Sequence, residues 1–240
     1  MKIGKIIRRI FITKKCVLCG EVIGFDSDKP FCHDCKEKFD SLLNTKCHTC
    51  GYKNSECTCL PNQITKICKN GAVWCVFYDA DSKFGANNLV FGLKREYNRD
   101  VVDFCTSFMA KNIVNLCIRH GINYKDYVVT YAPRRKNGKR KYGFDHSKKL
   151  AKALALRLGL DVIDCFINVG KTEQKSLTKQ ERKQNAKSSY FMKDNLVLEN
   201  KRVFIVDDII TTGATMSTLA ELLYEKGASD VIPVAYAKRN

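Results

Sequence analysis

Two adjacent carboxylates, Asp207 and Asp208, lie between an apolar run and a turn of small hydroxyl residues. The apolar run, residues 203–206, is β-favouring and predicts a buried strand that leads directly into the acids. Carboxylates accept strong hydrogen bonds from the hydroxyl groups of a sugar. In a parallel α/β sheet, ligands bind at the carboxyl ends of the strands. The order therefore predicts a sugar-binding site in which Asp207 and Asp208 are the candidate catalytic residues.

The turn that follows the acids is suited to a phosphate group. It combines three hydroxyl side chains with a glycine and an alanine: Thr211, Thr212, Gly213, Ala214 and Thr215. Glycine lets the backbone approach a ligand closely, and a helix expected over residues 215–226 would add the positive end of its dipole. An Asp-Asp-Thr order also occurs as ordinary helix capping, so a plain strand ending in a capped helix is the alternative.

Eight of the thirteen cysteines lie before residue 60 in close pairs. The paired spacing predicts two tetrahedral thiolate sites for zinc, and closed sites of this kind are structural. We expect consecutive pairs to form the sites, although a cross-braced pairing fits the spacing too. His33 and His48 lie inside Cys-x-x-Cys loops, and each could replace a cysteine. The predicted ligands are Cys16, Cys19, Cys32 and Cys35 for one ion, and Cys47, Cys50, Cys57 and Cys59 for the other.

The sequence does not predict a membrane-spanning or a secreted protein. No apolar stretch reaches the ~20 residues that a membrane span needs. Arg8 and Arg9 interrupt the apolar N-terminal segment, so residues 1–13 predict a short amphipathic helix and no signal peptide. Cysteine pairs without a secretion signal favour metal over disulfides, and hence a reducing cytoplasm.

Beyond the cysteines, strands and helices alternate. Strands are expected over residues 72–78, 127–131, 162–166, 203–206 and 231–236, and helices over 86–94, 100–120 and 146–158. This alternation predicts an α/β fold with a parallel sheet covered by helices on both faces. We expect a zinc-ribbon domain over residues 1–68 and the α/β domain over residues 69–240, with residues 60–70 as the linker.

The chain resembles the ComF family, in which a cysteine-rich zinc module precedes a type I phosphoribosyltransferase domain. The acid pair and its hydroxyl turn resemble the segment by which that domain binds phosphoribosyl pyrophosphate (PRPP). The segments at residues 131–135 and 142–145, and a spaced pattern from Gln174 to Asn185, also resemble the family. Asp145 and His146 depart from it, since asparagine and glutamine are usual there.

The resemblance implies a PRPP site with Mg²⁺ at Asp207 and Asp208, the 5′-phosphate on residues 211–215, and pyrophosphate near Arg134 and Arg135. It implies glycosyl transfer from PRPP if the chain is active, and partners in the DNA-uptake machinery. Purine-salvage relatives often carry an acid three residues after the second carboxylate. Thr211 stands at that position, so purine salvage by that mechanism is not expected.

The formal net charge of +17 attracts polyanions. Six cations fall within residues 134–141, with aromatic residues nearby, which suits single-stranded DNA. The predicted contacts are Arg134, Arg135, Arg140 and Lys141. The competing hypothesis is therefore a non-catalytic protein that handles single-stranded DNA and uses the fold as a scaffold. A lysine-rich solvated surface is the plainer alternative.

Overall fold

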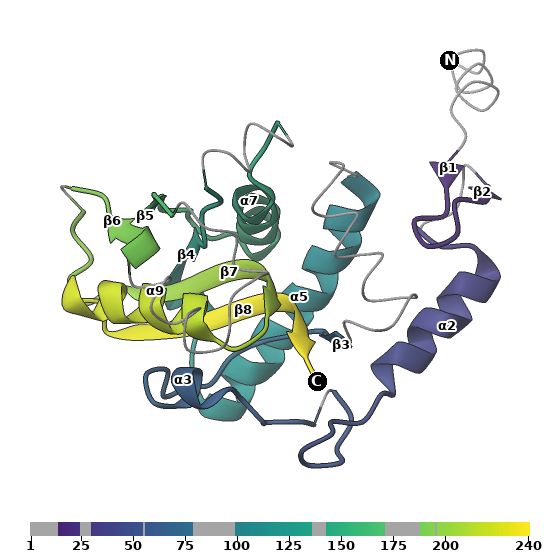
Figure 1. The fold of residues 1–240 in the computed structure, drawn as a ribbon, viewed down its shortest axis with the longest axis horizontal. Helices are drawn as coiled ribbons and strands as arrows, with labels where there is room; N and C mark the ends of the chain where they lie inside the picture. Colours follow the sequence, from purple (N-terminus) through teal and green to yellow (C-terminus); the bar gives the residue numbers. More distant parts are fainter. Residues whose placement is uncertain are drawn as a thin grey trace.

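A four-stranded parallel sheet forms the centre of the molecule (Figure 1). The computed structural model describes residues 14–24, 30–54, 56–78, 99–135, 143–170, 188–194 and 196–240. The strand order is β3-β8-β7-β4, and every neighbouring pair is parallel. The strands are β3 (Val76–Tyr78), β4 (Tyr127–Tyr131), β7 (Arg202–Ile210) and β8 (Asp230–Arg239).

Helices cover both faces of this sheet, as the alternation predicted. On one face lie α5 (Arg99–His120) and α7 (His146–Leu158), and on the other lie α3 (Asn62–Thr65) and α9 (Ala214–Glu225). Alternate residues of β7 serve the two faces, because side chains along a strand point to opposite sides. Phe204 and Val206 pack toward α5 and α7, whereas Val203 and Ile205 pack toward α9. The expected α/β fold with helices on both faces is confirmed.

Several expected strands differ in extent from the structure. The strand expected over residues 72–78 is shortened to β3 with a bridge at Val73, and β8 is longer than the expected 231–236. β7 does not end at Val206 but continues through both aspartates to Ile210, because β8 runs beside it as far as Lys238. The strand expected over residues 162–166 is reduced to one bridge, between Val129 and Val162. After that bridge the chain turns away from the sheet as β5 (Phe166–Asn168), which pairs antiparallel with β6 (Tyr190–Met192).

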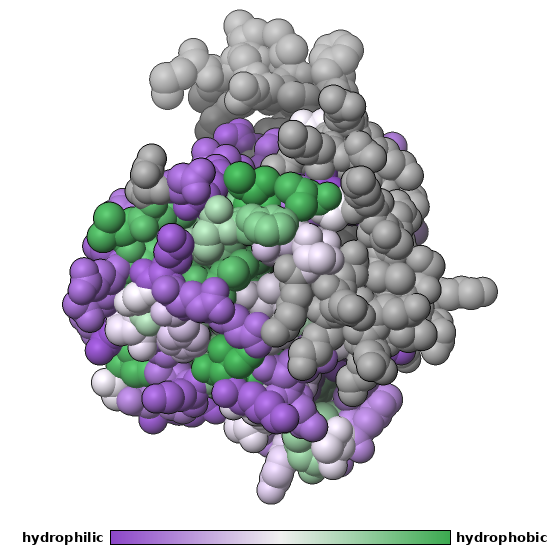
Figure 2. Space-filling view, turned by 60° about the vertical axis from the view of Figure 1, so that its left-hand side comes forward, coloured by the Kyte–Doolittle hydropathy of each residue, from purple (hydrophilic) through white to green (hydrophobic). Residues whose placement is uncertain are grey.

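The β5–β6 hairpin shows the alternation of a strand pair with one buried face. Phe166 and Tyr190 are buried in the core beside α9, whereas Ile167, Val169 and Phe191 are exposed. Figure 2 brings this end of the molecule forward and shows apolar groups separated by hydrophilic side chains. The hairpin therefore covers the end of α9 without extending the parallel sheet.

The expected helices over residues 100–120 and 146–158 are present as α5 and α7. The helices expected over residues 1–13 and 86–94 lie outside the described residues. By length and composition α5 could cross a membrane, but half of its most apolar window is buried inside the structure, as in the core helix of a globular fold.

The N-terminal module packs against α5 through aromatic rings. It consists of a hairpin, β1 (Lys14–Lys15) and β2 (Val22–Ile23), and helix α2 (His33–Leu43). Phe39 of α2 meets Phe104 of α5 edge to face, with ring centroids 5.1 Å apart, and also contacts Phe31 and Phe108. Edge-to-face pairs are favourable beyond the area they bury. The module is therefore joined to the sheet domain by a continuous apolar core.

Residues 60–70 are not a free linker. Ile64 of α3 is fully buried in the core beneath α9, and Cys68 is buried with it. Asn70 donates a hydrogen bond to Asp230 at the start of β8. The connection after the second cysteine group is thus part of the packed α/β core, while the boundary at residue 68 stays a prediction.

Candidate functional site

The eight predicted zinc ligands form two separate groups of four, and within each group the sulfur atoms lie within 4.8 Å of one another. The groups follow chain order, Cys16, Cys19, Cys32 and Cys35, then Cys47, Cys50, Cys57 and Cys59, so the cross-braced arrangement does not occur. His33 is exposed beside Asp34, and the backbone N–H of His48 donates to Asn240. Neither histidine belongs to a group.

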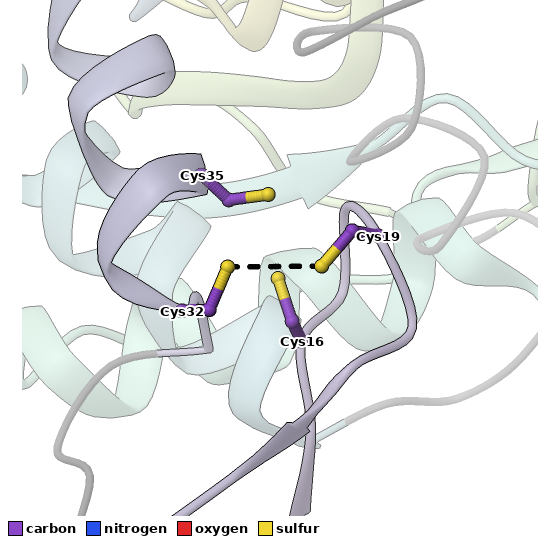
Figure 3. Close-up of side chains that lie close together, drawn as sticks. All are labelled: Cys16, Cys19, Cys32 and Cys35. Carbon is purple, nitrogen blue, oxygen red and sulfur yellow. Dashed lines mark hydrogen bonds between the residues drawn. The ribbon is translucent and has the colours of Figure 1, made fainter.

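The first group has the dimensions of a zinc tetrathiolate (Figure 3). Cys16 and Cys19 come from the turn between β1 and β2, while Cys32 and Cys35 sit at the N-terminus of α2. The sulfur atoms of Cys19 and Cys32 are 3.7 Å apart. Four sulfur ligands at ~2.3 Å from one zinc ion would be roughly 3.8 Å apart. The separation of the Cys19 and Cys32 sulfur atoms therefore matches that of a zinc tetrathiolate.

The thiol pKa values show why each group needs a cation. Burial raises the pKa of Cys16, but hydrogen bonds from the backbone of Cys19 and Cys32 outweigh burial and lower it to about 7. Burial and the neighbouring thiols raise the pKa of Cys35. In the second group, burial raises the pKa of Cys57 to about 12 and the backbone of Cys50 helps lower that of Cys47 to about 6. Ionisation of one thiol thus disfavours ionisation of its neighbours, and a bound cation would favour the thiolate form of all four.

The acid pair lies on β7 just beyond the point where the neighbouring strand β4 ends. Tyr131, the last residue of β4, pairs with Val206, so Asp207 and Asp208 emerge beyond the end of that strand. Asp207 Oδ1 accepts a hydrogen bond of 2.9 Å from Ser147 in the first turn of α7, and another from the backbone N–H of Asp208. At the acids, β7 is therefore still paired with β8 on one side but no longer with β4 on the other.

Burial and the neighbouring carboxylate raise the pKa of Asp207 to about 6. The opposing influences are His146, the backbone N–H of Asp208 and the Ser147 hydroxyl. Asp208 is buried and Asp207 is half-buried, and two neighbouring carboxylates repel each other when both are ionised, so a cation would stabilise the ionised pair. The pair can hold a divalent cation together with sugar hydroxyls.

His146 completes this group, and sequence reasoning did not select it. Its Nε2 atom lies 3.0 Å from Oδ2 of Asp208, and both side chains are buried. One ligand atom from each of His146, Asp207 and Asp208 falls within 4.8 Å of the others. The departure at Asp145-His146 was the available signal. Asp145 caps α7 through the backbone N–H of Lys148, and it thereby places His146 against the acids.

The predicted phosphate-binding turn follows β7 and leads into α9. Gly213 takes a left-handed conformation with φ of 79° and forms the N-cap of the helix. Thr212 accepts a hydrogen bond from the backbone N–H of Ala214, and Thr211, Thr212 and Thr215 are half-buried. Burial raises the pKa of Tyr190 of β6, and a hydrogen bond with Thr215 opposes that rise. Hydroxyls and a helix N-terminus therefore converge beside the acids.

The segment that follows the second cysteine group packs against this turn. A Cβ atom added to Gly213 would lie 2.9 Å from Ile64 Cγ1 and 3.1 Å from Pro61 Cβ. Such distances are shorter than van der Waals contact, so the turn is held against α3. Chain order places Pro61 two residues after Cys59. The predicted phosphate-binding turn therefore packs against the segment that follows the second cysteine group.

The predicted cations divide between described and undescribed residues. Arg134 and Arg135 follow β4, and the backbone N–H of Arg134 donates a 3.0 Å hydrogen bond to Asp145. Arg135 is close enough to Tyr190 to act on its pKa. Both arginines therefore belong to the loop beside the acids, while Arg140 and Lys141 lie outside the described residues.

Comparisons with known proteins agree with this geometry. Residues 143–240 match the family model "Phosphoribosyl transferase domain". The chain is 23% identical over 237 residues to the competence protein ComFC of Streptococcus pneumoniae, a match covering 90% of this chain and 96% of the relative. The two sequence matches confirm the expected likeness to the ComF family and its phosphoribosyltransferase-like domain.

Two solved structures are similar over part of their length. The hypoxanthine phosphoribosyltransferase of Trypanosoma cruzi matches with 16% identity and a TM-score of 0.35, over 55% of this chain and 62% of that one. The phosphoribosylpyrophosphate synthetase of Mycobacterium smegmatis matches with 20% identity and a TM-score of 0.32, over 57% of this chain and 33% of that one. The chain therefore spans less than two thirds of either structure.

We expect two zinc ions per chain, one in each cysteine group, because each group supplies four sulfur ligands and no open position. Cys19→Ser should reduce the metal content to about one ion per chain, measured by elemental analysis of the purified protein. Cys165→Ser, which changes a cysteine outside both groups, is the control and should retain two ions. Full metal content in Cys19→Ser would contradict the assignment.

Gly213→Ala should destabilise the fold, because alanine is strained at this positive φ and its Cβ would overlap Ile64. Gly121 has a φ of 63° with no atom within 4 Å of an added Cβ, so Gly121→Ala isolates the backbone strain. We expect about 1 kcal/mol from strain in Gly121→Ala and roughly 1–3 kcal/mol more in Gly213→Ala, measured by urea unfolding.

The double variant Ile64→Ala/Gly213→Ala tests the overlap directly. Removing the Ile64 side chain makes room for the new methyl group, so the two effects should be less than additive. Strict additivity would show that Ile64 does not confine the turn.

Proposed function

We propose that this ComF-family, phosphoribosyltransferase-like protein binds PRPP with Mg²⁺ at the acid pair and the adjoining hydroxyl turn. The supporting observation is the convergence of Asp207, Asp208 and His146 beside the N-terminus of α9. A sugar phosphate carries hydroxyls at one end and a dianion at the other, and these two halves of the site match them.

The acid pair is suited to the sugar end. Asp207 and Asp208 would accept hydrogen bonds from the ribose hydroxyls, and charge-assisted bonds of this kind are the stronger ones. Burial and the repulsion of Asp208 raise the pKa of Asp207, so a positive charge would stabilise the ionised pair. Mg²⁺ that accompanies PRPP would supply that charge. Ser147 and His146 hold the two carboxylates in place through Asp207 Oδ1 and Asp208 Oδ2, respectively.

The turn is suited to the 5′-phosphate. Thr211, Thr212 and Thr215 offer hydroxyl donors, and α9 adds the partial positive charge of its N-terminus. Gly213 takes the positive φ that the turn requires, and its lack of a side chain leaves room for Ile64 of α3 behind the turn. No cationic side chain from the turn is required, and the segment from 211 to 215 contains none.

Pyrophosphate would then lie toward residues 132–135, where Arg134 and Arg135 meet its charge. In glycosyl transfer from PRPP the bond from the sugar C1 to pyrophosphate breaks as the acceptor's bond to C1 forms, through an oxocarbenium-like sugar. Positioning and charge stabilisation are sufficient for this reaction, and the chain needs no nucleophile of its own. Thr211 supplies no carboxylate for deprotonating a purine base, so the site does not fit purine salvage by that mechanism.

The named relative supports a cellular role. Since the most extensive sequence match is to a competence protein, we propose that the chain acts in the cytoplasm during DNA uptake, in contact with single-stranded DNA and other parts of that machinery. The basic segment of residues 134–141 would provide the DNA contact, and its cations would follow the phosphate backbone. In the alternative, the same DNA contact operates without any turnover of PRPP.

Calorimetry with PRPP and Mg²⁺ tests the sugar-phosphate site. Wild type should bind, and Asp207→Asn/Asp208→Asn should bind about a hundredfold more weakly, because two charge-assisted acceptors are lost. Asp103→Asn changes an acid on α5 that pairs with Arg157, far from the site in the fold, and is the matched control. An absence of binding by the wild-type protein would exclude this function.

Neutralising separate parts of the basic loop distinguishes pyrophosphate contacts from DNA contacts. Arg135→Gln should weaken PRPP binding, since Arg135 follows β4 at the end of the sheet where the acids lie and its charge acts on the pKa of Tyr190. Arg140→Gln/Lys141→Gln should instead reduce the salt dependence of single-stranded DNA binding, by a slope of about 1.4 for two phosphate contacts at ~0.7 each. An unchanged slope would remove Arg140 and Lys141 from the DNA contact.

A further inference from the structure

We propose a second ligand site, for a nucleotide, in the cavity between the second cysteine group and α5. The cavity has a volume of about 360 Å³, within the range of small-molecule sites. It lies along the segment that enters β3, and β8 separates β3 from the strand that carries the acid pair. Its ligand would therefore be bound independently of the proposed PRPP site.

Amide side chains dominate the polar lining of this cavity. Asn54 comes from the second cysteine loop, and Asn112, Asn115 and Arg119 come from α5. Trp74, just before β3, completes the polar set. Asn54 and Asn112 already donate to the backbone carbonyls of Cys75 and Trp74, so each offers a ligand its Oδ1 acceptor. Asn115 offers a donor and an acceptor side by side, the pattern by which asparagine recognises the edge of a nucleobase.

Two buried polar atoms of this lining have no hydrogen-bond partner among the described residues. They are Oδ1 of Asn54, an acceptor, and Nε1 of Trp74, a donor. Each residue is only 7% exposed, and the amide nitrogen of Asn54 is already bonded to the carbonyl of Cys75. A buried polar atom without a partner is unfavourable by about 1–3 kcal/mol. Both atoms lie beneath the accessible surface, so a ligand that reaches them must enter the lining deeply and must offer both a donor and an acceptor.

The open end of the cavity carries positive charge. Asn115 and Arg119 are one helical turn apart on α5, and both are exposed. Arg119 has no carboxylate partner within the described part of the chain. A guanidinium at the mouth matches a phosphate attached to a base that enters the cavity. The lining therefore fits a nucleoside monophosphate, either free or as an unpaired nucleotide in a strand.

Trp74 provides a direct signal, because it is the only tryptophan in the chain. Its fluorescence should change saturably when the zinc-loaded full-length protein is titrated with the four deoxynucleoside monophosphates. At least one of them should bind, and inorganic phosphate and ribose 5-phosphate should bind at least tenfold more weakly because they lack a base. An equal response to ribose 5-phosphate would overturn the proposal.

Exposed variants make the test specific to this cavity. Arg119→Gln and Asn115→Ala should each weaken binding about tenfold, the effect of losing one polar contact to a charged or base-edge group. Lys111→Gln changes an exposed cation of the same helix that does not line the cavity, and it should leave binding unchanged. Calorimetry of the same titrations gives affinities without reliance on fluorescence. No nucleotide binding, or unchanged affinity in Arg119→Gln and Asn115→Ala, would overturn the proposal.

Two further arms identify the source of the ligand and its independence from the acid pair. A short single-stranded oligonucleotide whose binding weakens in Arg119→Gln would show that a nucleotide within a strand enters the cavity. Binding of mononucleotides alone would assign the site to free nucleotides. A nucleotide also carries a sugar phosphate, so the titration is repeated in Asp207→Asn/Asp208→Asn. Binding that disappears there belongs to the other site and would refute the proposed cavity.

Discussion

The repulsion between Asp207 and Asp208 is the constraint on which the arrangement of the site depends. Adjacent acids in a buried strand are unfavourable unless neighbouring groups and a ligand compensate their charge. The structure supplies part of that compensation from α7, whose first turn places Ser147 on one carboxylate and His146 on the other. Asp145 fixes that turn by capping the helix and by binding the backbone of Arg134. One helix N-terminus thus positions the acids and the loop after β4 together.

The N-terminal module contributes to the same site through packing. The chain leaves the second cysteine group and immediately forms α3, whose Ile64 is fully buried against Gly213. Lys238 near the end of β8 adds a second connection, because its ammonium donates to the carbonyl of Cys59 and lies 4.7 Å from the Trp74 ring centre. A buried ammonium beside a thiolate group offsets negative charge. The order of the second cysteine group is therefore coupled to the turn that leads into α9.

Sequence reasoning predicted the elements whose patterns are local. The β4 strand, the α7 helix and the two cysteine groups follow from alternation, capping and spacing, and each is present. The length of β7 could not be predicted, because only pairing with β8 carries the strand through two charged residues. The role of His146 also depends on a contact sixty-two positions away in sequence, with Asp208. Likewise the burial of Ile64 and Cys68 depends on the core they share with α9, which no local pattern indicates.

The way in which β7 ends shows what kind of ligand the site can take. β7 stays paired with β8 beyond the acids, so the sheet holds the carboxylates rigidly. On the other side, β4 pairs with β7 only as far as Val206, one residue before Asp207, and does not extend beside the acids. A rigid acid pair beside a helix N-terminus suits a ligand with hydroxyls and phosphate at a fixed separation. Among the described residues, Thr211 offers a hydroxyl and no carboxylate to a base, and the geometry selects no acceptor. The proposed site therefore restricts the sugar phosphate more narrowly than the product formed from it.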